Sequence, residues 1–169
     1  MTQKGIYISL LLYIAISIAA NGQDYKVPTN YKFDKKSDFV NYEKDILECI
    51  NYVEKTPIKN NKNREKAVTF LTQWITGTPT FSITLTPKII SFMDSPELLS
   101  AFMGGWTKLV LEHPELKNEV EKCNYAGLLS VINVYTLNKE LNRDKGVEKF
   151  IKLEKKGELM EWVTSQLKK

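Results

Sequence analysis

Residues 95–112 read SPELLSAFMGGWTKLVLE, and this stretch decides the fold. Ser95 is a preferred N-cap residue, Pro96 suits the first helical position, and Glu97 is an acid in the first turn. Pro114 cannot continue a helix, so the pattern stops near Glu112. The stretch therefore predicts a long helix with a defined start and a defined end.

Helical patterns also follow this stretch. Residues 125–137 carry no charge, which predicts a helix in the centre of the molecule. Two shorter patterns, Asp144–Lys155 and Glu158–Leu167, predict terminal helices separated by Gly157.

The residues before the stretch are helical in pattern too. A helix is expected to begin with Ser37 as its N-cap, to show one apolar face from Phe39 to Val53, and to end at Thr56-Pro57. Another is expected from about Asn63 to Thr76, and a short one from Thr86 through Met93.

The segment from Thr80 to Thr86 has a different period. Phe81, Ile83 and Leu85 alternate with Thr and Ser, and Pro79 and Pro87 bound the run. A period of two predicts a short strand or an extended connector, and no second alternating segment offers a pairing partner.

These patterns together predict an all-α fold, a compact bundle of five to seven helices with one short extended segment at about 80–86. Residues 67–138 carry only four basic and six acidic side chains, whereas the flanking regions are rich in charge. We therefore expect the middle of the chain to supply most of the core.

The first 23 residues have the pattern of a secretory signal peptide. Lys4 precedes an uncharged apolar run from Ile6 to Ala20, and small residues at Ala20 and Gly22 suit cleavage before Gln23. The run is shorter than the roughly 20 residues that cross a bilayer. Cleavage predicts an exported protein, periplasmic or secreted, without a transmembrane span; the alternative is an uncleaved N-terminal anchor. Residues 24–36 are expected to form an extended leader and residues 37–169 a single helical domain.

Composition excludes several classes of function. One His and two Cys among 169 residues cannot supply a zinc site with four Cys and His ligands. Without Lys4 the chain carries 23 basic against 20 acidic residues, a net charge of +3 that is too mild to indicate a nucleic-acid partner. The Gly-x-Ser-x-Gly elbow and the phosphate-binding Gly-x-x-x-x-Gly-Lys-Ser/Thr motif are both missing. The sequence indicates no cofactor.

Cys49 and Cys123 allow two interpretations. An exported chain with an even number of Cys can form a disulfide, and closing a loop of roughly 75 residues would stabilise the fold by about 4 kcal/mol. The alternative is two separately buried thiols, because Cys49 lies on the apolar face of its expected helix beside Ile46 and Ile50.

Three further features are candidate sites. Gly104, Gly105 and Trp106 lie inside a helix, where each Gly costs about 1 kcal/mol relative to Ala; they indicate either close helix packing or a backbone-lined ligand floor beside Trp106. His113 with Glu112 and Glu115 could form a weak metal site or contain a general base, or simply be a helix C-terminus. The alternating segment 80–86 could accept a partner strand or remain an internal connector.

Four short stretches resemble uncharacterised small exported proteins of Gram-negative bacteria. They are Thr86–Met93, Ser95–Leu99, Met103–Thr107 and the junction Ala20–Asp24. The resemblance covers about residues 45–165. It implies a helical exported domain and carries over no catalytic residue.

The sequence thus favours an exported, non-catalytic helical domain that binds an envelope protein or a small apolar ligand. The alternative is a small envelope hydrolase that uses carboxylate or metal chemistry around His113. A purely structural envelope component is a third interpretation.

Overall fold

A computed structural model of the chain describes residues 25–168, so the predicted signal peptide lies outside the described residues. This part of the chain is helical, with one short 3-10 helix, and contains no strand, which confirms the all-α prediction. The elements are α1 (Lys36–Asn41), α2 (Glu43–Lys55), α3 (Lys62–Gly77), α4 (Pro96–Glu112), η1 (Pro114–Leu116), α5 (Val120–Leu137), α6 (Lys145–Lys155) and α7 (Leu159–Leu167).

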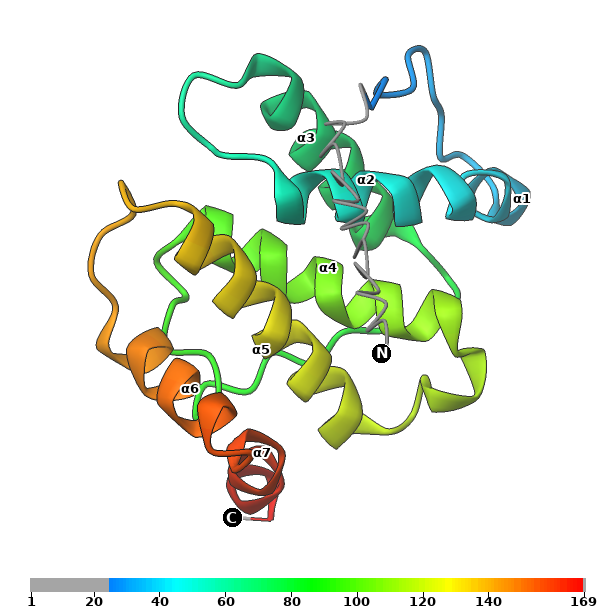
Figure 1. The fold of residues 1–169 in the computed structure, drawn as a ribbon. Coiled ribbons are helices and arrows are strands. Elements are labelled where there is room, and N and C mark those ends of the chain that lie inside the picture. Colours follow the sequence, from blue (N-terminus) through cyan, green and yellow to red (C-terminus); the bar gives the residue numbers. More distant parts are fainter. Residues whose placement is uncertain (1–24, 169) are drawn as a thin grey trace, which may run out of the picture.

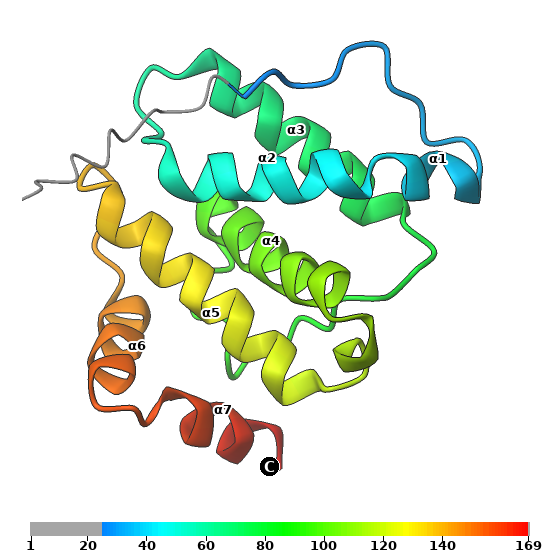
Figure 2. The same cartoon turned by 45° about the vertical axis from the view of Figure 1, so that its right-hand side comes forward.

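Helices α4 and α5 form the centre of the bundle and make its most extensive helix contact. Helices α2 and α3 pack on one side of this pair, and α6 and α7 pack against α5 on the other (Figures 1 and 2). Between residues 25 and 168, none of the helices is both long and apolar enough to cross a membrane.

The core consists of two clusters of buried side chains. The first joins the leader to α1–α3 and includes Phe70 and Trp74. The second joins residues 89–92 to α4–α7 and includes Phe102 and Trp106. Phe81 packs against both clusters, so the segment between α3 and α4 lies at their junction.

Helix α4 begins where the sequence predicts. Ser95 has an extended backbone, and its hydroxyl oxygen accepts a hydrogen bond from the Leu98 N–H at 3.4 Å. Pro96 occupies the first turn, and the helix ends at Glu112, before Pro114. The capping residues therefore fix both ends of the central helix.

The N-terminal helix was expected to run unbroken from its N-cap Ser37 to Thr56-Pro57. Its end is confirmed, since α2 ends at Lys55 with Thr56 as the C-cap, but its start and its continuity are wrong. The N-cap is Lys35, two residues earlier than expected, because the Asp38 carboxylate accepts hydrogen bonds from the N–H groups of Asp34 and Lys35, both at 3.1 Å. Tyr42 then separates α1 from α2. Its ring packs against Phe70 at a centroid distance of 5.8 Å, which holds this residue in the aromatic part of the first cluster.

The short helix expected over Thr86–Met93 is replaced by turns. The Thr86 carbonyl oxygen accepts hydrogen bonds from the Ile89 N–H at 2.8 Å and the Ile90 N–H at 3.0 Å. These turns bury Ile89, Ile90 and Phe92 in the second cluster and leave Met93 exposed. The apolar residues of this stretch are therefore buried without a helix.

We call residues 78–95, between α3 and α4, the connector. Its residues 81–86 lie in no helix, strand or turn, and exposure alternates along Thr80–Thr84, as an extended backbone requires. In Figure 1 the connector leaves α3 at the right of the view and passes behind α4. The predicted extended segment is thus confirmed, although Leu85 is 37% exposed and does not share the burial of Phe81 and Ile83.

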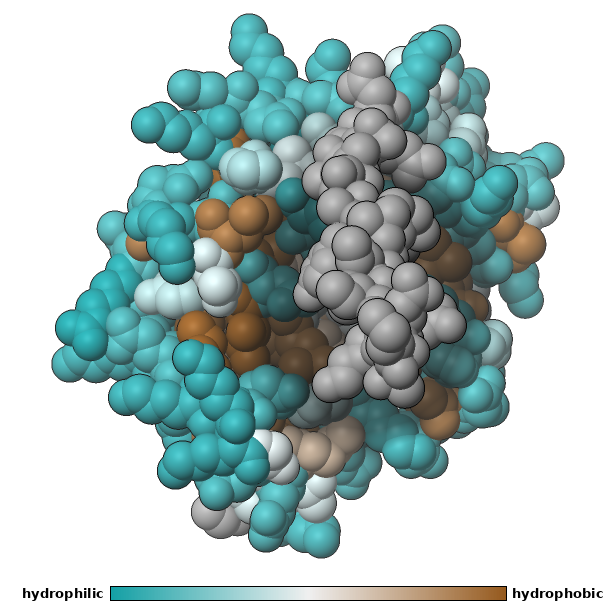
Figure 3. All heavy atoms as spheres, in the orientation of Figure 1, coloured by the Kyte–Doolittle hydropathy of each residue, from teal (hydrophilic) through white to brown (hydrophobic). Residues whose placement is uncertain are grey.

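The face shown in Figure 3 is mostly hydrophilic, and its hydrophobic residues gather around the middle of α4 and α5. Four large hydrophobic side chains are at least 37% exposed in the described chain, and two of them, Leu85 and Met93, belong to the connector. The connector therefore contributes half of the large exposed hydrophobic side chains in this part of the chain.

Candidate functional site

The connector borders a surface groove, which we define by the residues that line it. One wall is formed by connector residues, and the other by α4 and the corner that leads into α5. The lining residues are Thr80, Phe81, Ser82, Thr84, Trp106, Lys117, Asn118 and Val120, and the groove holds about 380 Å³. This volume is at the lower end of the range for ligand pockets, about 300–1,000 Å³.

The backbone of the connector is unpaired beside this groove. Within residues 25–168, no backbone N–H or C=O group of residues 81–85 forms a hydrogen bond. The bonds at the ends of the run are local: the Thr80 N–H donates to the Thr78 hydroxyl at 3.4 Å, and Thr86 accepts from the turn that follows. An extended run of free donors and acceptors is the chemical requirement for adding a strand.

Trp106 provides the aromatic part of the groove. Its side chain is 1% exposed and packs edge-on against Phe102 at a centroid distance of 6.1 Å. Its indole N–H has no acceptor in the described chain. The nitrogen atom is itself buried, so Trp106 contributes its ring to the wall of the groove and offers no exposed donor there.

The two glycines beside Trp106 serve helix packing. A Cβ atom on Gly105 would lie 2.5 Å from the Ala126 carbonyl oxygen and 2.7 Å from the Ser130 Cβ atom, so α4 and α5 approach closely there. A Cβ atom on Gly104 would make ordinary contacts of 3.6 Å with Ile50 and Leu71. The glycines thus face neighbouring helices, and of the three predicted residues only Trp106 lines the groove.

The two cysteines are free thiols buried in different clusters. The Cys49 thiol donates to the Ala67 carbonyl oxygen at 3.2 Å, and the Cys123 thiol to the Leu116 carbonyl oxygen at 3.5 Å. Burial raises the pKa of Cys49 to about 12 and that of Cys123 to about 11. The structure therefore has two separate buried thiols and not the disulfide.

His113 lies on the surface at the C-terminal end of α4. Its Nδ1 atom is 3.5 Å from the Glu115 carboxylate, and both side chains are more than half exposed. No group of three or more His, Cys, Asp and Glu residues in the described part of the chain could hold a metal ion. The hydrolase hypothesis thus rests on a solvent-exposed pair of residues, neither of which lines the groove.

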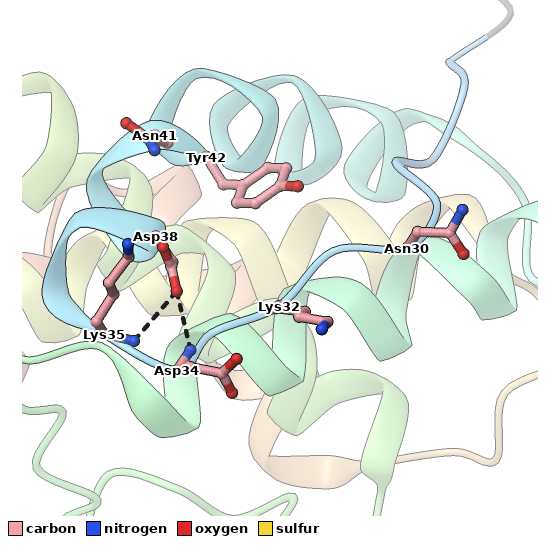
Figure 4. A pocket seen from close by; sticks show the side chains of 7 residues that line it. All are labelled: Asn30, Lys32, Asp34, Lys35, Asp38, Asn41 and Tyr42. Carbon is pink, nitrogen blue, oxygen red and sulfur yellow. Dashed lines mark hydrogen bonds between the residues drawn. The ribbon is translucent and has the colours of Figure 1, made fainter.

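A second depression lies between the leader and α1. It holds about 420 Å³ and is lined almost entirely by polar side chains (Figure 4). The lining residues are Asn30, Lys32, Asp34, Lys35, Asp38, Asn41 and Tyr42. Figure 4 shows the Asp38 carboxylate hydrogen-bonded to the backbone of the leader. These hydrogen bonds stabilise the start of α1. The depression is therefore explained by the hydrogen bonds that hold the leader against the start of α1.

No family model, curated protein or solved structure matches this chain. The resemblance to small exported proteins therefore stays a prediction. We infer a function from the geometry of the groove alone.

Sequence reasoning identified one wall of the groove and missed part of the other. The alternation of segment 80–86 and the aromatic ring of Trp106 were both visible in the sequence. Lys117, Asn118 and Val120 carry no motif, and they reach the groove because η1 turns the chain between α4 and α5. For these three residues the one local signal in the sequence was Pro114, which cannot continue the preceding helix and therefore predicts a turn there.

Proposed function

We propose that this chain is an exported, non-catalytic binding domain that holds a protein partner as an extended segment along the connector. The observation that carries the proposal is the unpaired backbone of residues 81–85 beside a groove. Strand addition uses the backbone for affinity and alternating side chains for specificity, and the connector supplies both. Export is supported by the N-terminal sequence pattern, including Lys4 and the apolar run after it.

A protein segment fits the groove better than a small apolar ligand. The lining combines Phe81, Trp106 and Val120 with the polar side chains of the remaining five residues. A purely apolar ligand would leave those polar groups without partners, whereas a polypeptide offers both hydrogen-bonding groups and side chains.

The test is a calorimetric titration of the full chain with an uncharged heptapeptide of alternating Thr and Val. We expect saturable one-to-one binding, because the peptide can pair with the connector backbone. The same peptide with every backbone N–H methylated has no donor on either edge and should bind at least about tenfold more weakly. Equal binding of the two peptides, or no binding of either, would reject the proposal.

The variant His113→Ala separates this proposal from the hydrolase alternative. His113 lines no part of the groove, so peptide binding should be unchanged. A hydrolytic activity of the wild type that is lost in the variant would favour the hydrolase instead.

A further inference from the structure

We infer that the partner strand is supplied by a second copy of this chain, through antiparallel pairing of the two connectors about Ile83. The inference rests on the proposed function, since it uses the same unpaired backbone, and it names the partner.

The two edges of the connector differ in what they can still bind. In an extended chain, alternate residues direct their N–H and C=O groups to opposite edges. The even-numbered edge is partly used, because the Thr80 N–H and the Thr86 C=O have partners within the chain. The odd-numbered edge, formed by Phe81, Ile83 and Leu85, is free throughout in the described structure. Pairing is therefore expected on the odd edge.

The sequence of the segment matches its own reverse. Antiparallel pairing about Ile83 places Phe81 opposite Leu85, Ser82 opposite Thr84, and Thr80 opposite Thr86. Apolar residues thus meet apolar ones and hydroxyl residues meet hydroxyl ones, which is the pattern of stabilising cross-strand pairs. The exposed Leu85 gains an aromatic neighbour from the second copy.

The prolines fit the same symmetry. In this register Pro79 falls opposite Pro87, and both lie on the odd edge, where neither has an N–H to donate. They end the ladder at both of its ends. On the even edge only Ser82 and Thr84 keep free groups, because the Thr80 N–H and the Thr86 C=O are occupied, so a further strand would find a shorter ladder there than on the odd edge.

Charge permits the approach of two copies at this place. The chain carries a formal net charge of +4, whereas residues 67–87 carry none. Two positively charged molecules repel each other, and an uncharged strip is where that repulsion is smallest.

The first test measures the association of the full chain by sedimentation equilibrium over a range of concentrations. We expect a reversible monomer–dimer equilibrium, with a Kd raised at least about tenfold by Leu85→Pro, which removes an odd-edge N–H. The matched comparison is Leu85→Ala, which shortens the same side chain but keeps the odd-edge N–H, so it should raise the Kd by less than Leu85→Pro does. Circular dichroism confirms that each variant keeps its helices.

The second test fixes the register without relying on proline. Ser82→Cys and Thr84→Cys lie directly opposite each other in this pairing, at a non-hydrogen-bonded position where the Cα atoms are about 4.5 Å apart. This spacing suits a disulfide. A mixture of the two variants should form a cross-linked dimer under mild oxidation, and neither variant alone should do so.

The outcomes separate the two proposals. If the chain stays monomeric but binds the Thr-Val heptapeptide, the second copy is not the partner and the proposed function stands. If it neither dimerises nor binds the peptide, both fail. A dimer that is unaffected by Leu85→Pro, or cross-linking of either cysteine variant alone to the same extent as the mixture, would overturn the pairing.

Discussion

Gly105 of α4 lies directly against Ser130 of α5: a Cβ atom on Gly105 would fall 2.7 Å from the Ser130 Cβ atom. The Ala126 carbonyl oxygen would be nearer still, at 2.5 Å. Because α4 and α5 form the central helix pair, this contact sets the distance between the two helices on which the rest of the bundle packs. It also places Trp106, the next residue, at the groove.

Gly105→Ala should lower the free energy of unfolding by about 1–3 kcal/mol, because the added methyl group meets backbone that cannot move away cheaply. The control is Gly104→Ala, one residue earlier, where the methyl group makes only ordinary contacts. That variant should gain up to about 1 kcal/mol from helix propensity. Urea unfolding measures both, and equal effects of the two variants would contradict this packing.

Asn138 joins two distant parts of the chain and should be sensitive to truncation. Its side-chain oxygen accepts from the Ile58 N–H at 2.7 Å, and its amide donates to the Val134 carbonyl oxygen at 2.7 Å. The side chain is 1% exposed, so Asn138→Ala leaves the Ile58 N–H without a partner and should cost about 1–3 kcal/mol. The Val134 carbonyl oxygen keeps a partner, because the backbone N–H of residue 138 also donates to it at 3.1 Å. The exposed Asn142→Ala is the control and should change stability by less than about 0.5 kcal/mol.

The two thiols should react only after unfolding. Cys49 and Cys123 are both buried, and burial raises the pKa of each, so the reactive thiolate is scarce in the folded state. Iodoacetamide should leave the native protein unlabelled and add two groups in urea without any reductant. An intact mass that shows no labelling in urea would instead indicate a disulfide.

Stability should fall at alkaline pH because of Cys49. A free Cys has a pKa near about 8.5, whereas burial raises that of Cys49 to about 12. Below about pH 8.5 both the folded and the unfolded chain hold this proton. Above it the unfolded chain releases the proton first, so the free energy of unfolding decreases by up to about 1.4 kcal/mol per pH unit. Urea unfolding of Cys49→Ala should show a shallower decrease over the same range, and equal slopes would assign the effect to other groups.

The helices were predictable wherever local chemistry defines their ends. Ser95 with Pro96, and Asp144 as the N-cap that accepts from the Val147 N–H at 2.9 Å, begin α4 and α6 as their sequences indicate. The prediction failed at Tyr42 and at residues 86–93, where side chains from other helices decide the backbone. Long-range packing of this kind leaves no periodic signal in the sequence.

The groove was predictable only in part for a related reason. The period of two in segment 80–86 is a local signal, and it predicted an extended segment there, with an exposed edge as one of two alternatives. Trp106 lies beside this segment because of the way α4 packs against the connector. The spacing of residues along α4 or along the connector does not reveal this packing. The glycines next to Trp106 indicated either close helix packing or a ligand floor, and in the structure they face α2, α3 and α5, as the packing interpretation expects.

Amide hydrogen exchange at Phe81, Ile83 and Leu85 tests the central claim most directly, because the claim is that these groups are free to accept a strand. In dilute solution we expect rapid exchange at all three positions, since none has an acceptor in the described chain. Addition of the Thr-Val heptapeptide, or a rise in protein concentration, should slow exchange at these positions more than at Ser82 and Thr84. Slow exchange already in dilute solution, or exchange unaffected by peptide and by concentration, would contradict the account.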